Sequence, residues 1–189
     1  MLYTYQTARL TLKNLNEDAA GLTTEFYVRN RDYFAPWEMS HPEAYFTSAY
    51  QRRVLEAEAV QFLRSEGARY YMFLPEREVP IGSLSFQHIT PAPDASCQIG
   101  YRLDHEFTGC GYMTEALLAM IPKAFFHYHL HRMEANIQPE NTASLKMMER
   151  LGFTFEGTAR GRYLIGGTYR DHLRYSLLAD DANFTSIYQ

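Results

Sequence analysis

The sequence predicts one mixed α/β (α+β) domain, with a central sheet of about seven strands and about four flanking helices. Strand-like and helix-like segments are mixed along all 189 residues, and no internal repeat or linker separates them. Hydrophobic residues make up 46% and aromatic residues 15% of the chain, as in a globular protein with a sizeable core. A single domain is therefore expected over residues 1–189, with its core at about 8–179.

Hydrophobic periodicity gives the order of the elements, because strands alternate polar and apolar residues whereas helices repeat every three or four positions. The expected N-terminal elements are a strand at Leu10–Leu12, a helix from Asn16 to about Phe34 and a helix from Thr47 to Ser65. The expected later elements are strands Arg69–Leu74, Ile81–Ile89 and Cys97–Asp104, helix Tyr112–His127, strand 132–138, helix 141–151, and strands 153–160 and 171–178.

Local signals set several of these boundaries. Asn16 is the expected N-cap of the first helix, Pro36-Trp37 ends it, and Gly67 stops the second helix. Pro122 removes a backbone hydrogen bond, so a kink or an earlier end is expected there. Gly166-Gly167 predicts a turn within the segment 161–170. The buried stripe of the second helix is expected to contain Val54, Leu55, Ala59, Phe62 and Leu63.

Composition argues against several function classes. The formal net charge is −4 and no Lys/Arg-rich run is present, which argues against nucleic-acid binding. No apolar stretch approaches the roughly 20 residues that span a bilayer, and the N-terminus lacks a signal-peptide core. Cys97 and Cys110 form no disulfide framework. A cytoplasmic protein without membrane contact is expected. The alternating histidines at 127–131 lack a further ligand, so no metal is expected.

The segment around Gly109 and Gly111 is the most informative part of the chain. A strand-like run precedes it and an apolar helix follows it. Glycine allows the backbone to approach a ligand closely, and a helix N-terminus offers unpaired N–H groups that bind phosphate. A purely structural glycine turn is the alternative. Within the loop, Cys110 is either a small residue that fits a tight turn or a thiol of lowered pKa.

A second block, Arg132–Phe153, reads as a strand, an Asn141-led turn, a short helix and a Leu-Gly-Phe exit. Together with Pro36-Trp37 and the run Tyr169–Leu177, these blocks resemble the GNAT N-acetyltransferase superfamily, and within it the bacterial ribosomal-protein N-terminal alanine/serine acetyltransferases. The resemblance covers nearly the whole chain. It implies a single-domain GNAT fold with a mixed, mostly antiparallel central sheet, acetyl-CoA as co-substrate, and a monomer or homodimer.

The resemblance also implies where acetyl-CoA binds. The pantetheine arm is expected along the strand residues Tyr101, Arg102 and Leu103, and beside Asn141. The pyrophosphate is expected at the backbone of the glycine loop, and Thr114 could add a hydroxyl. Glu106 stands at the first position of the family's Q/R-x-x-G-x-G/A signature and departs from it, which weakens any phosphate contact by that side chain. The loop residues expected at the cofactor are Thr108, Gly109, Cys110, Gly111, Tyr112, Met113 and Thr114.

Ser144 is the expected proton donor to the CoA sulfur, directly or through a water that it holds. The alternative, from the residues alone, is that Asn141 caps the helix and that Ser144 is an exposed first-turn residue. Many superfamily members use a tyrosine as the acid, and Met148 takes that position here. The resemblance therefore favours Ser144 as the acid.

The general base and the acceptor pocket are less defined. Glu134 shares one strand face with Asn136 and Gln138, and could relay a proton through water; a solvated edge carboxylate is the alternative. Asp171 is a second candidate at the substrate pocket, and a structural ion pair with a neighbouring arginine is its alternative. Trp37 is expected as a pocket wall, or else as a core residue.

These observations predict a cytoplasmic transferase that moves an acetyl group from acetyl-CoA to a primary amine. The N-terminal α-amine of a protein, such as a ribosomal protein, is the preferred acceptor. A small-molecule amine such as a drug, toxin or polyamine is one alternative. A catalytically silent acetyl-CoA-binding module is another.

Overall fold

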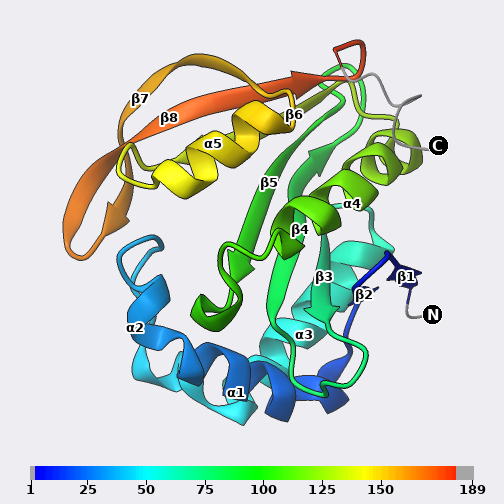
Figure 1. Ribbon diagram of the computed structural model, residues 1–189, viewed down its shortest axis with the longest axis vertical. Helices are drawn as coiled ribbons and strands as arrows, with labels where there is room; N and C mark the ends of the chain where they lie inside the picture. The colour runs from blue at the N-terminus through cyan, green and yellow to red at the C-terminus, as the bar shows by residue number, and fades with distance from the viewer. Residues whose placement is uncertain (1–2, 182–189) are drawn as a thin grey trace.

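An eight-stranded sheet with helices on both faces forms the structure, a computed structural model that describes residues 3–181 (Figure 1). The strand order is β1-β2-β3-β4-β5-β6-β8-β7, and only β5 and β6 pair in parallel. The strands are β1 (Thr4–Gln6), β2 (Thr11–Lys13), β3 (Ala68–Phe73), β4 (Gly82–Thr90), β5 (Ser96–Leu103), β6 (Arg132–Ile137), β7 (Thr154–Ile165) and β8 (Thr168–Leu178). The helices are α1 (Ala20–Arg29), α2 (Arg31–Phe34), α3 (Ser48–Leu63), α4 (Tyr112–Tyr128) and α5 (Thr142–Arg150), with short 3₁₀ turns at Glu17–Ala19, Glu43–Phe46 and His105–Phe107.

The predicted mixed, mostly antiparallel sheet is confirmed, and one strand more is present than expected. The additional strand β1 is three residues long and pairs with β2, so no alternation over several residues could indicate it. The strands β7 and β8 run further than predicted, into a hairpin that turns at Gly166-Gly167. Pairing of Tyr163 with Arg170 extends this hairpin through the segment expected as a loop.

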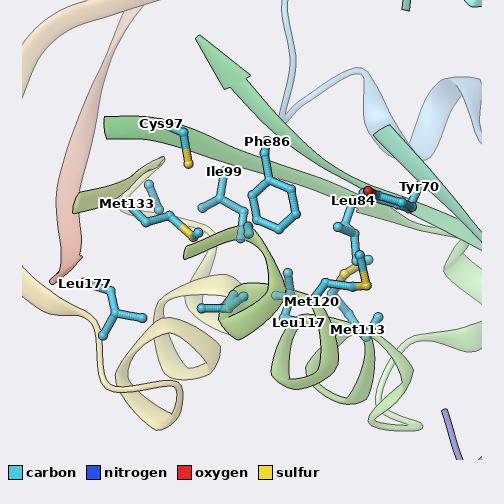
Figure 2. Packing of buried hydrophobic residues seen from close by; sticks show 14 of the residues in the cluster. Tyr70, Leu84, Phe86, Cys97, Ile99, Met113, Leu117, Met120, Met133 and Leu177 are labelled. Atoms are coloured by element: carbon cyan, nitrogen blue, oxygen red, sulfur yellow. The ribbon is translucent and has the colours of Figure 1, made fainter. Parts of the chain in front are cut away.

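Alternation along β3 shows how the sheet buries both faces. Tyr70 and Met72 belong to the main core with α4, whereas Tyr71 and Phe73 pack in a second cluster with Leu55 of α3. Figure 2 shows the main core, in which α4 residues lie against sheet residues from β3, β4, β5, β6 and β8. The labelled residues are Tyr70, Leu84, Phe86, Cys97, Ile99, Met113, Leu117, Met120, Met133 and Leu177.

The first predicted helix is divided into a 3₁₀ turn, α1 and α2. Asn16 is the N-cap of the 3₁₀ turn, as predicted, but its side chain makes no capping bond and its amide donates to Asp18 instead. The break between α1 and α2 falls at Asn30, whose fully buried amide donates to the carbonyl of Phe26 and accepts from the backbone N–H of His105. A tertiary contact 75 residues away in sequence therefore interrupts the helix.

The predicted extent of α4, about Tyr112 to His127, is confirmed, whereas the stop of the second helix at Gly67 and an earlier end of α4 at Pro122 were wrong. The helix α3 ends at Leu63, which is 79% exposed and outside the buried stripe, and Arg64 rather than Gly67 closes the helix. The helix α4 continues through Pro122 to Tyr128 without an earlier end. Proline has no N–H group, so the helix loses one hydrogen bond, to the carbonyl four residues earlier. The helix continues nevertheless, because Pro122 and its neighbour Ile121 are buried against the core.

Candidate functional site

The sheet opens between β5 and β6. These parallel strands pair only where Ser96–Gln98 meets Arg132–Glu134. Beyond those pairs β5 continues to Leu103 and β6 to Ile137 without pairing to each other, and Figure 1 shows the two strands diverging. The edge of β5 that faces β6 therefore keeps unpaired backbone groups, which an extended ligand can bind as an added strand would.

A pocket of about 170 Å³ lies in this opening. It brings together four of the predicted site residues, which come from the α2–α3 connection, β5, the β6–α5 turn and α5. Those four are Trp37, Tyr101, Asn141 and Ser144, and the other lining residues are Ile99, Gly100, Ala135, Asn136, Ile137, Gln138 and His172.

The glycine loop leads directly into α4. Gly109 has φ +77° and Gly111 has φ +79°, a left-handed conformation that side chains rarely adopt. Gly111 is the N-cap of α4 and has no side chain to satisfy the first-turn N–H groups. A seventeen-residue helix thus presents free N–H groups and the positive end of its dipole at the loop. This geometry suits a phosphate group.

The other predicted loop residues contribute chiefly backbone. Met113 is 4% exposed and packs in the core, so only its N–H group can face a ligand. Thr108 donates its hydroxyl to the carbonyl of His105, and Cys110 is exposed. Thr114 and Tyr112 are half-buried in the first turn of α4.

Sequence reasoning missed Arg9, which holds the glycine loop in place. Its guanidinium donates to Glu115 Oε2 at 2.6 Å and to the carbonyl of Cys110 at 3.0 Å, and it lies 4.5 Å from the centre of the Tyr112 ring. Thr7 also donates to the Glu115 carboxylate. No local pattern indicates these contacts, because they join residues about a hundred positions apart.

A buried carboxylate fixes the start of the same loop. Asp104 has a fully buried side chain, accepts from Arg29 Nε at 2.7 Å and accepts from the backbone N–H of Glu106 at 3.1 Å. Burial raises the pKa of Asp104, but its hydrogen bonds and the Arg29 charge together outweigh burial and hold the pKa below its usual value. The loop is thus anchored to α1 at one end and to the N-terminal segment at the other.

At the opposite wall of the pocket, Asn141 caps α5. Its side-chain oxygen accepts from the backbone N–H of Ser144 at 3.2 Å, which confirms the predicted capping bond. Ser144 itself is half-buried and lines the pocket, so the alternative of an exposed first-turn serine was wrong. Met148, at the position of the family's tyrosine, is fully buried in the core and lies outside the pocket.

Tyr101 places a polar group beside Ser144. Its hydroxyl is enclosed and has no hydrogen-bond partner of standard geometry among residues 3–181. Burial raises the pKa of Tyr101 to about 12, against a smaller opposite effect of the Ser144 hydroxyl. An enclosed hydroxyl without a partner is costly, so a ligand atom in the pocket would offset that cost.

Arg102 and Leu103 lie on the same strand but outside the pocket lining. The Arg102 guanidinium donates to Glu38 at 2.5 Å, so its side chain is engaged away from the opening. The neighbouring Trp37 is 38% exposed at the pocket. Its loop is held by this ion pair and by Gln138, whose amide donates to the carbonyl of Pro36 at 2.9 Å. Trp37 is therefore a pocket wall and not a core residue.

The two predicted carboxylates do not line the pocket. Glu134 is half-buried and accepts from Arg132 at 2.7 Å, in an ionic cluster that also contains Glu156 and Arg174. It is therefore not the solvated edge carboxylate of the alternative reading. Asp171 is exposed and accepts from the backbone N–H of Gly161 at 2.7 Å. The expected ion pair with a neighbouring arginine is absent from the part of the chain that the structure describes.

The residue after Asp171 occupies the pocket instead. His172 is 3% exposed, and the edge of its ring contacts Tyr163 of β7, with ring centres 4.8 Å apart. Alternation along β8 puts His172 on the opposite face from Asp171. The sequence already indicates this placement, because polar and apolar residues alternate along the strand. The polar residues are His172, Arg174 and Ser176, and the apolar ones are Leu173, Tyr175 and Leu177.

The geometry fits a CoA thioester. The strand β5 runs from its paired end at Ser96–Gln98 past the pocket, and the glycine loop at the N-terminus of α4 follows it in the chain. Residues 9–154 match the family described as acetyltransferase (GNAT) domain. The chain belongs to this family and is an N-acetyltransferase.

Particular relatives extend the comparison. The [ribosomal protein uS5]-alanine N-acetyltransferase of Escherichia coli is 31% identical over 178 residues, which cover 93% of this chain and 90% of that protein. The crystal structure of the ribosomal-protein-S5-alanine acetyltransferase from Vibrio fischeri superposes with a TM-score of 0.91 at 28% identity, covering 95% of this chain and 98% of that one. Mycobacterium smegmatis RimJ, solved with CoA-disulfide, shares the fold at 22% identity and a TM-score of 0.88, over 95% of this chain and 86% of its own.

Residues 3–181 also bear on membrane and metal binding. None of the helices there combines the length and apolar composition that a membrane crossing requires. No group of three or more His, Cys, Asp or Glu side chains in that range is arranged to hold a metal ion.

Proposed function

We propose that this protein transfers the acetyl group of acetyl-CoA to the N-terminal α-amine of a protein, a ribosomal protein being the favoured substrate. The observation that carries the proposal is the pocket at the β5–β6 opening, where Ser144 and Asn141 lie beside an unpaired strand edge. The E. coli relative, matched over nearly its whole length, is named for acetylating an alanine of uS5. Cytoplasmic location is part of the proposal, since ribosomal proteins are made there.

In this proposal the chain holds acetyl-CoA mostly by its backbone. N–H groups from Thr108 to Met113 bind the pyrophosphate, with Thr114 adding a hydroxyl. The β5 edge at Tyr101–Leu103 and the Asn141 amide bind pantetheine. Ser144, or a water that it holds, protonates the departing sulfur, and Trp37 borders the acceptor amine. Glu134 and Asp171 act only through water, because neither lines the pocket.

An α-amine suits this site better than a lysine side chain. Only a neutral amine attacks a thioester, and an α-amine with a pKa of about 7.7–8.0 is roughly 20–30% neutral near pH 7.4. A lysine with a pKa of about 10.4 is about 0.1% neutral there, a disadvantage of a few hundred-fold. None of the carboxylates of residues 3–181 lines the pocket, where it could offset that disadvantage.

A pair of peptides tests the proposal, with CoA thiol release as the readout. One peptide has a free N-terminal alanine and no lysine; the other is N-terminally blocked and contains one lysine. The free N-terminus is expected to react with a kcat/KM at least about a hundredfold higher, as the neutral fractions imply. Comparable rates would overturn the α-amine assignment. A response only to polyamines or aminoglycosides would indicate a small-molecule enzyme. Binding of acetyl-CoA without thiol release in the presence of any of these amines would indicate a silent binding module.

A further inference from the structure

The pocket contains a buried histidine, His172, in addition to the residues assigned to acetyl-CoA and the acceptor. His172 comes from β8, and its ring is held between the Tyr163 ring and the backbone carbonyl of Arg170. Such a position is costly for a polar ring unless its nitrogens are satisfied. The two nitrogens of His172 differ in this respect.

The Nδ1 atom lies 3.1 Å from the carbonyl oxygen of Arg170. A carbonyl only accepts, so Nδ1 carries the proton and the neutral ring has its lone pair on Nε2. Among the described residues Nε2 has no hydrogen-bond partner, yet it is not one of the fully enclosed atoms, unlike Tyr101 Oη. The ring is thus fixed in the tautomer that leaves an accessible acceptor.

We infer that His172 Nε2 accepts the proton from the substrate amine during acetyl transfer. The inference rests on the proposed function and adds a general base to it. The carrying observations are the pocket position, the Arg170 carbonyl contact that fixes the tautomer, and the accessible Nε2 atom.

The lone pair of the neutral amine forms the new N–C bond to the acetyl carbon, and the nitrogen becomes positively charged and strongly acidic. His172 Nε2 takes that proton, while the C–S bond breaks and its electron pair leaves with sulfur. Ser144, or a water that it holds, protonates the sulfur to give the CoA thiol. Solvent then returns a proton to Ser144 and takes one from His172.

The surroundings keep His172 neutral near pH 7. Burial lowers its pKa below the usual value, and the Arg162 charge acts in the same direction; the Arg170 carbonyl, Asp171 and Glu140 oppose this more weakly. A base of low pKa cannot deprotonate a free lysine, but it can accept a proton from the far more acidic nitrogen formed on attack. The titratable or charged groups that contact His172, line the same pocket or act on its charge are Arg162 and Tyr163 from β7, Arg170 and Asp171 from β8, Glu140 from the β6–α5 turn and Tyr101 from β5.

The test variant removes the Nε2 atom and keeps the hydrogen bond from the side chain to the Arg170 carbonyl. In His172→Asn the side-chain amide can still donate to the Arg170 carbonyl, as Nδ1 does, whereas nothing occupies the Nε2 position. The kcat on the free N-terminal peptide is expected to fall by about a hundredfold or more, the usual share of a general base. Acetyl-CoA affinity, measured by calorimetry, is expected to stay within about twofold because the contacts assigned to CoA are untouched. His129→Asn is the matched control: it removes an exposed histidine at the left-handed C-cap of α4, where asparagine is well tolerated.

The pH profile separates catalysis from structure. Below the pKa values of both the amine and His172, log kcat/KM of the wild type should rise with a slope of about two, because two groups must lose protons. In His172→Asn the slope should be about one. Should the Asn variant fail to fold by circular dichroism, His172→Gln, which puts a non-titrating amide near Nε2, is expected to show the same loss and slope.

Wild-type kcat or an unchanged slope of two in either folded variant would overturn the inference and leave the proposed function intact. A wild-type protein that acetylates no N-terminus would instead overturn the proposed function itself.

Discussion

Replacing Gly111 by valine is expected to weaken acetyl-CoA binding at least tenfold, which is about 1.4 kcal/mol. Gly111 has φ +79° and ψ +3°, and a β-branched residue in that left-handed region costs about 1–3 kcal/mol. An added Cβ would meet Arg9 Nη2 at 3.5 Å, an ordinary contact, so no clash arises in the free protein. The free protein therefore pays only backbone strain. The larger loss comes on binding, because the side chain occupies the space where the pyrophosphate meets the backbone.

A matched variant separates backbone strain from the loss of the cradle. Gly166 at the tip of the β7–β8 hairpin also has positive φ, +56°, and an added Cβ there meets nothing within 4 Å. Gly166→Val should therefore lower the melting temperature about as much as Gly111→Val does, and leave the affinity unchanged. The assay is isothermal titration of each folded variant with acetyl-CoA. An unchanged affinity in Gly111→Val would show that the pyrophosphate binds elsewhere.

Two further predictions concern the acid and the buried carboxylate. Ser144→Ala should lower kcat by about 10²-fold, the usual share of a general acid. Little stability should be lost, because Asn141 caps α5 through the backbone N–H that alanine retains. Steady-state rates and melting curves measure the two effects, and a wild-type kcat with chemistry rate-limiting would end the assignment. Asp104→Asn should lower the free energy of unfolding by about 3 kcal/mol at pH 7, since it leaves Arg29 without its buried partner. The folded-state pKa of Asp104 is depressed, so its contribution is complete above the unfolded value of about 3.9 and is lost as pH falls below it. Urea titrations at several pH values should show the gap to wild type narrowing in acid, while the exposed Asp94→Asn shows no gap.

Local patterns in the sequence defined the centre of the sheet. The strands β3, β4 and β5 are buried segments bounded by turn residues, and each was predicted to within about one residue of its observed ends. The glycine pair before an apolar helix located the N-terminus of α4 at Tyr112 for the same reason. Family resemblance added Ser144 and Asn141, which the structure places in one pocket.

What the sequence did not reveal depends on contacts between distant residues. The break at Asn30, the Arg9–Glu115 contact and the engagement of Glu134 by Arg174 are pairings that no single segment encodes. His172 is different, because strand alternation could have indicated it. Residue type alone points to the Asp171 carboxylate, whereas alternation along β8 places His172 on the other face of the strand.

The opening between β5 and β6 also affects how the protein avoids self-association. Unpaired strand edges invite strands from other chains, and proteins usually place them under charge, proline or a covering element. Here the unpaired backbone groups of β5 lie inside the sheet, in a gap bounded by the paired residues up to Gln98 and Glu134. A foreign strand would have to enter a wedge that narrows to a closed end, with α5 across it (Figure 1). A narrow, flexible ligand can therefore bind this strand edge, whereas a strand of another β-sheet cannot pair with it.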